Sequence, residues 1–233
     1  EGKEHTVIAD AIVIATGSQP TTLPNLPVDG EFIVTSKELL DTTDIPKTLL
    51  IVGAGVEGCE FASLFAGLGS RVSLVEMAPQ ILPSEDTEVS AQIQSVFKKQ
   101  GIDLYLGTQV VEVEKSDENV QVTCSDGTTI VTDKVLVSVG RHINPQGLGL
   151  ENAGVAVGNC GEITVNEYLE TTAPGIYAIG DVTGKSMLAH VASYHGKVAV
   201  ENMMGNLIEI NDDVIPVGIF TVPEIGRVGI TEE

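Results

Sequence analysis

The sequence is short of bases, aromatic residues and long apolar runs. Twelve lysines and arginines stand against 33 aspartates and glutamates, giving a formal charge of −21, and tryptophan is absent. A surface of this sign repels polyanions, so we expect a solvated acidic surface and neither nucleic acid nor a membrane as partner. No apolar run approaches the roughly 20 residues of a membrane-spanning helix, and the acidic start does not resemble a signal peptide.

Cysteine is also scarce. Cys59, Cys124 and Cys160 are an odd set without C-x-x-C spacing, so we expect neither a disulfide framework nor a metal site. This usage favours a reducing, cytoplasmic location.

Glycine and aliphatic residues are plentiful. With 25 glycines and 42% hydrophobic residues, the 233 residues suit one large or two ordinary α/β domains. Alternating apolar and polar residues at 103–115, 119–124 and 128–132, with a turn signal at Asp126-Gly127, predict an antiparallel β-meander.

Residues 49–76 carry the most informative pattern. An apolar run, Leu49–Val52, predicts a buried strand and leads into a G-x-G-x-x-G turn, a stretch of helical period, a second strand and Glu76. This order is typical of a dinucleotide-binding βαβ unit. In such a unit Gly53 permits the tight turn, Gly55 lets the backbone approach a pyrophosphate, and Gly58 lets the helix pack closely. The alternative is a structural turn that merely needs glycine.

Glu76 lies 21 residues beyond Gly55, where a carboxylate accepts hydrogen bonds from the hydroxyls of the adenine ribose. A carboxylate would also face the 2′-phosphate of NADP. The sequence therefore predicts NAD as the preferred nucleotide.

Other elements follow from capping and periodicity. Acids after Ser84 and lysines before Gly101 predict a helix over 84–101, and a second helical period covers 187–204. Apolar runs predict strands within 6–15, at 134–139 and at 176–179.

Two features indicate a piece of a longer polypeptide. The strands at 10–15 and 176–179 look like partners in one sheet, but no complete second βαβ unit accompanies them. The segment after Asp213 holds about one hairpin, which is marginal alone in water. A natural short chain that pairs with another subunit is the alternative.

Several blocks in order resemble the pyridine nucleotide–disulfide oxidoreductases, and within them the enzymes that oxidise dihydrolipoyl groups. The blocks are Ala15–Ser18, residues 53–60, Val75-Glu76, Gly140-Arg141 with Asn144-Pro145, residues 147–151, residues 175–181, Met187–His190, Phe220-Thr221 and Pro223-Glu224. The resemblance spans essentially the whole chain. It implies a Rossmann-like, FAD- and NAD(P)-binding fold of two dinucleotide folds. The implied parts are an FAD-domain segment at 1–20, an NAD-binding domain at 21–143, a second FAD-domain segment at 144–213 and the start of a dimerisation domain at 214–233.

The resemblance also implies site residues. On the NAD side, Glu60 would lie towards the nicotinamide and Glu76 at the adenine ribose; the remaining residues would hold the pyrophosphate or line the site: Gly53, Ala54, Gly55, Val56, Glu57, Gly58, Val110 and Gly140. On the FAD side, a turn, a strand end and the start of a helix under the flavin would contribute Thr16, Gly17, Ser18, Gly180, Asp181, Met187, Leu188, Ala189 and His190. Arg141 suits contact with a phosphate or carboxylate, and the alternative is that Gly140-Arg141 is a plain domain crossover.

Each role has a plainer alternative. Asp181 would then only cap a turn, and Glu60 would be an ordinary solvated helix acid, because the lysine it faces in the family is not in this chain. His190 is expected to contribute backbone contacts rather than acid–base chemistry. His195 is expected at the surface or in the core, and Cys59 is expected to pack as a small hydrophobe.

The implied reaction passes electrons from a dihydrolipoyl thiol pair to FAD and then as hydride to NAD. The implied partner is the dihydrolipoyl domain of a 2-oxo acid dehydrogenase-type complex, with a homodimer as the full-length state. The family's redox cysteine pair, first FAD glycine turn and C-terminal His–Glu pair are absent from these residues, so no catalytic residue is assigned and the chain alone is expected only to bind NAD(H). The alternatives are a mercuric reductase, a transhydrogenase, a glutathione reductase-like enzyme or a non-catalytic NAD-binding module.

Overall fold

The structure is a computed structural model that describes residues 5–143 and 145–232. Asn144, one of the motif residues above, lies outside the described residues. The chain forms two compact units: unit 1 comprises residues 1–19 and 141–215, and unit 2 comprises residues 20–140 and 216–233. None of the described helices combines the length and apolar character needed to cross a membrane.

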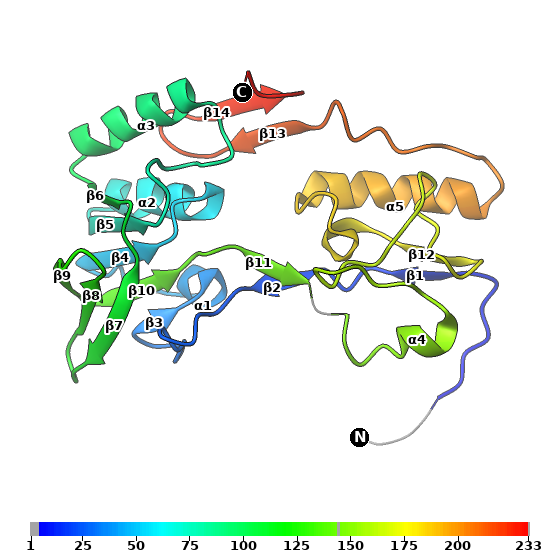
Figure 1. The fold of residues 1–233 in the computed structure, drawn as a ribbon, viewed down its shortest axis with the longest axis horizontal. Helices are drawn as coiled ribbons and strands as arrows, with labels where there is room; N and C mark the ends of the chain where they lie inside the picture. The colour runs from blue at the N-terminus through cyan, green and yellow to red at the C-terminus, as the bar shows by residue number, and fades with distance from the viewer. Residues whose placement is uncertain (1–4, 144, 233) are drawn as a thin grey trace. The chain divides into compact units, whose positions relative to one another are not determined.

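Unit 2 is built on a five-stranded parallel sheet with strand order β3-β10-β4-β5-β6 (Figure 1). The strands are β3 (Ile33–Val34), β10 (Lys134–Val137), β4 (Thr48–Val52), β5 (Arg71–Glu76) and β6 (Asp103–Leu106). Val52 is in register with Val75 of β5 and with Val137 of β10, so the carboxyl ends of the three central strands meet at one edge. The expected α/β class with a central parallel sheet is confirmed.

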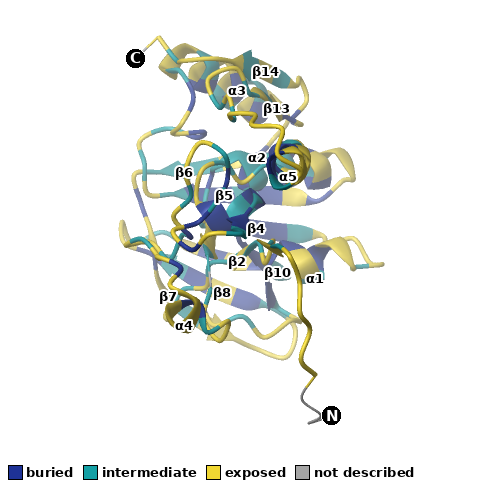
Figure 2. Cartoon of the chain, turned by 90° about the vertical axis from the view of Figure 1, so that its right-hand side faces the viewer, coloured by how far each residue is buried: buried dark blue, intermediate teal, exposed yellow. Residues whose placement is uncertain are grey.

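The sheet is buried on both faces because alternate residues of each strand point to opposite sides. On one face Leu49, Ile51 and Leu74 pack with the helices α2 (Val56–Gly67) and α3 (Thr87–Lys99). On the other face Leu50 and Val75 pack with the meander. Figure 2 shows the strands β4 and β5 in the dark blue of buried residues.

The meander consists of β7 (Val110–Lys115), β8 (Val120–Cys124) and β9 (Thr129–Thr132), paired antiparallel. Gly127 has φ +86° in the turn between β8 and β9, where the sequence predicts a hairpin turn. The alternating stretch 103–115 is not one strand: it divides into β6 and β7 around Gly107, which has φ +69°. Alternation alone does not reveal this break.

The helix expected over 84–101 begins only at Thr87. Asp86 holds the N-cap position without a side-chain cap bond, and its carboxylate instead accepts the backbone N–H of Glu232 at 2.7 Å. Glu85, expected in the first helical turn, lies before the helix and is buried. The C-terminal segment binds the side chains of both Glu85 and Asp86, so neither caps the helix. The local sequence cannot reveal these contacts.

That segment forms an antiparallel hairpin of β13 (Pro216–Ile219) and β14 (Ile225–Val228). Ile219 and Ile225 pack against the α2–α3 side of unit 2. A short helix, α1 (Ser36–Leu40), completes this unit and has a capping box between Thr35 and Glu38.

Unit 1 contains two pairs of short strands and two α-helices. β1 (Ile12–Ile14) pairs parallel with β12 (Ile176–Ala178), which confirms the predicted pairing of these segments. β2 (Ser18–Pro20) pairs with β11 (Arg141–Ile143). α4 (Leu150–Ala153) is short, and a 3₁₀ turn covers Gly180–Thr183. The helix predicted over 187–204 is α5, which runs from Ala189 to Met203.

The strand predicted within residues 6–15 is reduced to three residues. Val7 is 83% and Ile8 is 96% exposed, and within the described part of the chain no strand pairs with them. Backbone groups without a ladder partner stay solvated, so the apolar pattern does not become a strand there.

Candidate functional site

The turn between β4 and α2 forms a cradle that depends on glycine. Gly53 has φ +103°, and a Cβ there would clash with the carbonyl oxygen of Ser138; a Cβ at Gly58 would clash with the carbonyl oxygen of Gly53. Gly55 differs, because its φ is an ordinary −69° and a Cβ there would meet no atom within 4 Å. Packing explains two of the three glycines, and the third borders open space.

The start of α2 faces this space with unpaired donors. Gly55 is the N-cap and no side chain caps the helix. The N–H groups of the first turn have no partner inside a helix, and the helix dipole adds positive potential there. Such a helix start is suited to bind a phosphate.

A cleft of about 540 Å³ lies over the cradle at the carboxyl edge of the sheet. None of the described residues that line it is a lysine, arginine or histidine, so an anion there would depend on backbone donors. Residues at the ends of β4 and β5, at the start of β7 and in the loops after β4, β5 and β10 border it, among them Gly53, Gly55, Glu76, Val110, Ser138 and Gly140.

Glu76 is clamped at the end of β5. Its Oε2 accepts the N–H of Ala54 at 2.7 Å, and its Oε1 accepts the N–H of Ala78 at 2.8 Å. The half-buried carboxylate is thereby held at the wall of the cleft, with lone pairs left for ligand hydroxyls. Ala54 itself is buried, and its contribution to the turn is this N–H.

The other two acids of the turn have protein partners. Glu57 Oε1 accepts the hydroxyl hydrogen of Ser138 at 2.9 Å. Glu60 Oε1 accepts the N–H of Phe220 at 2.9 Å and does not border the cleft. Val56 packs on the core of unit 2. The structure therefore places Glu60 towards the C-terminal hairpin, in a bond that the sequence does not predict.

Sequence reasoning missed several residues that line the cleft, among them Ser138 and Asn25. Ser138 follows the buried strand β10 at the same edge as Gly53, so the rule that ligands bind at strand carboxyl ends could have found it. Asn25 donates its side-chain N–H to the carbonyl of Val110 at 2.8 Å and so fixes Val110 at the cleft. Nothing in the sequence near Asn25 indicates this role.

In unit 1, three predicted residues from distant segments meet. The Ser18 hydroxyl donates to Asp181 Oδ2 at 2.6 Å and accepts Arg141 Nε–H at 2.7 Å, and Arg141 Nη2 donates to the Ser18 carbonyl at 3.0 Å. Gly17 and Gly180 have φ +69° on either side of this group, which favours glycine at both positions. Thr16 is exposed and makes none of these bonds. The result is a polar cluster with one carboxylate held in place.

The segment Met187–His190 lies at the start of α5. Leu188 is the N-cap, Ala189 is the first helical residue, and Met187 and His190 are exposed. As in α2, the N-cap residue makes no side-chain cap bond to the first turn of this helix.

The three thiols are all free. Burial raises the pKa of Cys59 to about 12, and burial also raises the pKa of Cys124. Cys59 thus packs as a buried hydrophobe behind the turn. Among the described residues no cluster of three or more His, Cys, Asp or Glu could hold a metal ion.

Comparison with known proteins places this geometry in a family. A family model described as pyridine nucleotide-disulphide oxidoreductase matches residues 1–196. The chain is 41% identical over 239 residues to dihydrolipoyl dehydrogenase of Bacillus subtilis and 41% identical over 238 residues to leghemoglobin reductase of Vigna unguiculata. These alignments cover 100% of the chain and 50% and 46% of those two proteins.

The crystal structure of LpdA from Mycobacterium tuberculosis matches with a TM-score of 0.90 and 35% identity, over 96% of this chain and 49% of that one. The chain spans about half the length of the curated relatives it matches. The chain therefore belongs to the pyridine nucleotide–disulphide oxidoreductases, resembles the dihydrolipoyl dehydrogenases among them, and shares a family that uses FAD and NAD.

Proposed function

We propose that unit 2 is the NAD-binding part of a flavin-dependent, dihydrolipoyl dehydrogenase-like oxidoreductase. The observation that carries this proposal is the open space at Gly55, which borders a helix start without a cap and lies in the same cleft as the clamped Glu76. The pyrophosphate would bind the first N–H groups of α2, and the adenine ribose would bind Glu76. Val110 and Gly140 would form part of the walls.

The preference for NAD over NADP rests on Glu76. Both of its oxygens accept backbone N–H groups, so the carboxylate is not free to swing out of the cleft. A 2′-phosphate would meet this negative charge, and within 5–143 and 145–232 no lysine or arginine borders the cleft to offset it. Ribose hydroxyls, in contrast, can donate to the remaining lone pairs.

Unit 1 would form part of an FAD domain. Asp181, held by Ser18, would accept hydrogen bonds from the ribityl or pyrophosphate region, and the start of α5 at Met187–His190 would face the flavin. FAD would supply the two-electron carrier between a dithiol and NAD. The hairpin β13–β14 would begin an interface domain.

The full enzyme would oxidise a dihydrolipoyl group on a domain of a 2-oxo acid dehydrogenase-type complex, as a homodimer. We place it in the cytoplasm, which the three free cysteines support. The 233-residue chain alone would bind NAD(H) without turning over dihydrolipoamide, since it has no redox cysteine pair. Dihydrolipoamide-dependent NADH formation by the purified chain would contradict that expectation.

Titration of NADH and NADPH, followed by nicotinamide fluorescence, tests the nucleotide site. We expect NADH to bind and NADPH to bind at least about tenfold more weakly, because one misplaced charge contact costs more than about 1 kcal/mol. Glu76→Ala should weaken the binding of NADH about tenfold and narrow the difference in affinity between NADH and NADPH. The control Glu112→Ala, which changes an exposed acid of β7, should alter neither affinity. Equal affinity of the chain for both nucleotides would refute the NAD assignment.

The visible spectrum of the purified chain tests the FAD assignment. Flavin bands that disappear in Asp181→Ala would support it, and a chain that holds no added FAD would leave unit 2 as an NAD-binding module alone.

Another reductase of the family, such as a mercuric or glutathione reductase-like enzyme or a transhydrogenase, is the second candidate. This second candidate is supported by the 41% identity to leghemoglobin reductase, which equals the identity to the dihydrolipoyl dehydrogenase of Bacillus subtilis. Fluorescence changes with NADPH but not NADH would decide for it.

A further inference from the structure

A buried histidine in unit 1 lies directly behind the proposed FAD-binding turn. His195, on α5, has no solvent exposure. Its Nδ1 accepts the backbone N–H of Gly180 at 3.4 Å. A ring nitrogen that accepts a hydrogen bond carries no hydrogen, so the neutral ring has its hydrogen on Nε2.

The Nε2 atom lies near a second side chain, that of Asp212. It lies 3.5 Å from Asp212 Oδ1, and Asp212 Oδ2 lies 3.6 Å from Lys185 Nζ. Nε2 and Oδ1 are both buried, and neither has a hydrogen-bond partner among the residues that the structure describes. Buried polar atoms of this kind are costly when unpaired, and these two face each other a few tenths of an ångström beyond a good hydrogen bond.

Asp212 is brought there by the segment 205–213, which we call the connector. The Asn202 side chain accepts the N–H of Ile208 at 2.7 Å and donates to its carbonyl at 2.9 Å. Asn211 N–H donates to the Tyr194 hydroxyl at 3.2 Å. The path of the connector is thus determined by α5, and its contact with His195 is not an accident of a loose tail.

We propose that His195 is a positioning residue for the Gly180–Asp181 turn and that Asp212 holds its ring in the tautomer this task needs. Gly180 has a left-handed φ of +69° and leads directly into Asp181, so an acceptor for its N–H sets the direction in which that carboxylate leaves the turn. Ser18, which is itself bonded to Arg141, holds Asp181 at its side chain, and His195 accepts the backbone N–H of Gly180, the residue just before it. This role rests on the proposed FAD site, but the hydrogen bonds themselves do not.

The test uses the 233-residue chain with ring ¹⁵N shifts of His195 and amide exchange of Gly180 by NMR, followed by retention of added FAD. We expect a neutral ring with hydrogen on Nε2. His195→Leu should speed Gly180 exchange about five- to tenfold, the effect of losing one buried hydrogen bond. His195→Asn, which offers an acceptor near the Nδ1 position, should restore most of the protection, and Ser193→Ala, an exposed change on the same helix, should have no effect.

A second variant keeps the test decisive where His195→Leu does not fold. Asp212→Asn leaves the ring in place and should shift its Nε2 resonance and loosen Gly180. Unchanged Gly180 exchange in both variants, or a ring with hydrogen on Nδ1, would overturn the proposal. FAD affinity should fall about tenfold in His195→Leu and stay unchanged in Ser193→Ala. If the unmodified chain holds no FAD, the FAD proposal fails alone, because the NMR result still decides the role of His195.

Discussion

At the scale of single residues, the three glycines of the turn have different tasks. Gly58→Ala should destabilise the fold by several kcal/mol, about the cost of overpacking against rigid backbone, because its Cβ would clash with the carbonyl of Gly53. Gly55→Ala has room and an ordinary φ, so the free energy of unfolding should change by less than about 1 kcal/mol. NADH affinity of that variant should nevertheless fall at least about tenfold, because the methyl group enters the phosphate cradle.

Urea unfolding and NADH titration of the two variants measure this separation. A Gly55→Ala chain that binds NADH as the unmodified chain does would show that the cradle is not the phosphate site. A stable Gly58→Ala chain would show that the close approach of helix and strand is not required.

The thiols provide a second residue-scale prediction, in which pH enters. Burial raises the pKa of Cys59 to about 12, so its thiolate stays scarce well above the usual thiol pKa. At pH 8, DTNB should titrate one thiol, the exposed Cys160, and urea should release all three. At pH 10, Cys59 should still not react rapidly with DTNB. Cys160→Ser should abolish the rapid reaction with DTNB.

The raised pKa of Cys59 also makes the stability of the fold depend on pH. The neutral thiol is favoured in the folded chain, so the contribution of Cys59 to stability is complete below about pH 9 and is lost as the pH rises towards 12. Rapid modification of Cys59 at pH 8 would contradict its burial.

At the scale of elements, the hairpin β13–β14 is held on unit 2 by a few bonds from named side chains. Arg227 Nε lies 2.9 Å from Glu85 Oε2, and the Glu85 side chain is only 3% exposed. The Ser63 hydroxyl accepts the N–H of Val222 at 2.9 Å, and Glu60 accepts the N–H of Phe220. These bonds explain why a segment that is marginal alone is ordered here.

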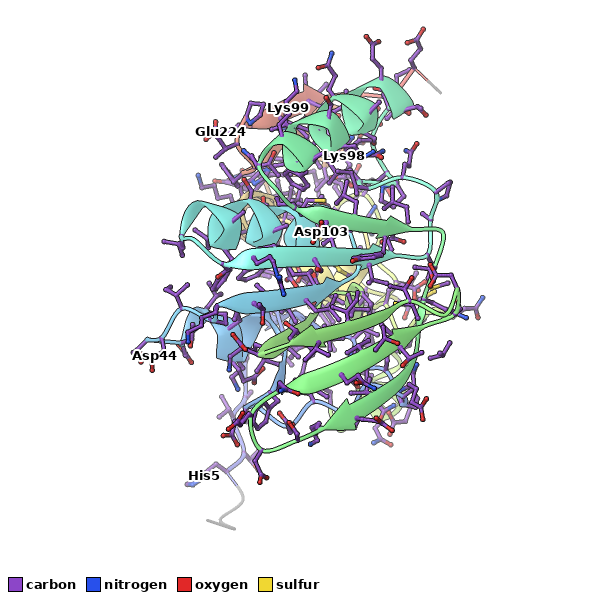
Figure 3. All side chains as sticks on the ribbon, turned by 90° about the vertical axis from the view of Figure 1, so that its left-hand side faces the viewer. His5, Asp44, Lys98, Lys99, Asp103 and Glu224 are labelled. Carbon is purple, nitrogen blue, oxygen red and sulfur yellow. The ribbon has the colours of Figure 1, made fainter. Side chains whose placement is uncertain are left out.

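Arg227→Ala should therefore destabilise unit 2 by about 1–3 kcal/mol, because it leaves a buried carboxylate without its cation. Lys99→Ala is the matched control: Lys99 ends α3, is labelled in Figure 3, and is exposed. Urea unfolding should show a loss for Arg227→Ala and almost none for Lys99→Ala. Equal stability of the two variants would mean that the apolar contacts of Ile219 and Ile225 hold the hairpin without this pair.

Element boundaries show where sequence reasoning stops. The strand at 49–52 and its helix were predictable because both faces of the strand and one face of α2 are apolar. The start of α3 was not predictable, because Glu85 and Asp86 have the sequence pattern of ordinary first-turn acids. In the structure they bind Arg227 and the N–H of Glu232, which lie near the C-terminal end of the sequence. Ser138 and Asn25 join the cleft through pairings with residues about 80 or more positions away.

At the scale of the molecule, the two units should respond differently to nucleotide. NADH at about 100 times its Kd should stabilise the unit that binds it by about 2.7 kcal/mol. Hydrogen exchange followed by mass spectrometry should then show slower exchange in peptides from 20–140 and little change in 150–200. Protection that falls mainly on 150–200 would place the nucleotide in unit 1 and contradict the proposed division.

The sequence by itself determined the family, the α/β class, the glycine cradle and the acid at the end of β5, because these depend on local spacing and apolar periodicity. Tertiary structure alone decided which groups meet: the clamp on Glu76 by two N–H groups, the Ser18–Asp181–Arg141 cluster, and His195 facing Asp212. It also turned Glu60 towards Phe220. The physical reason is that hydrogen bonds between segments far apart in sequence leave no periodicity behind, whereas a strand, a turn and a helix each do.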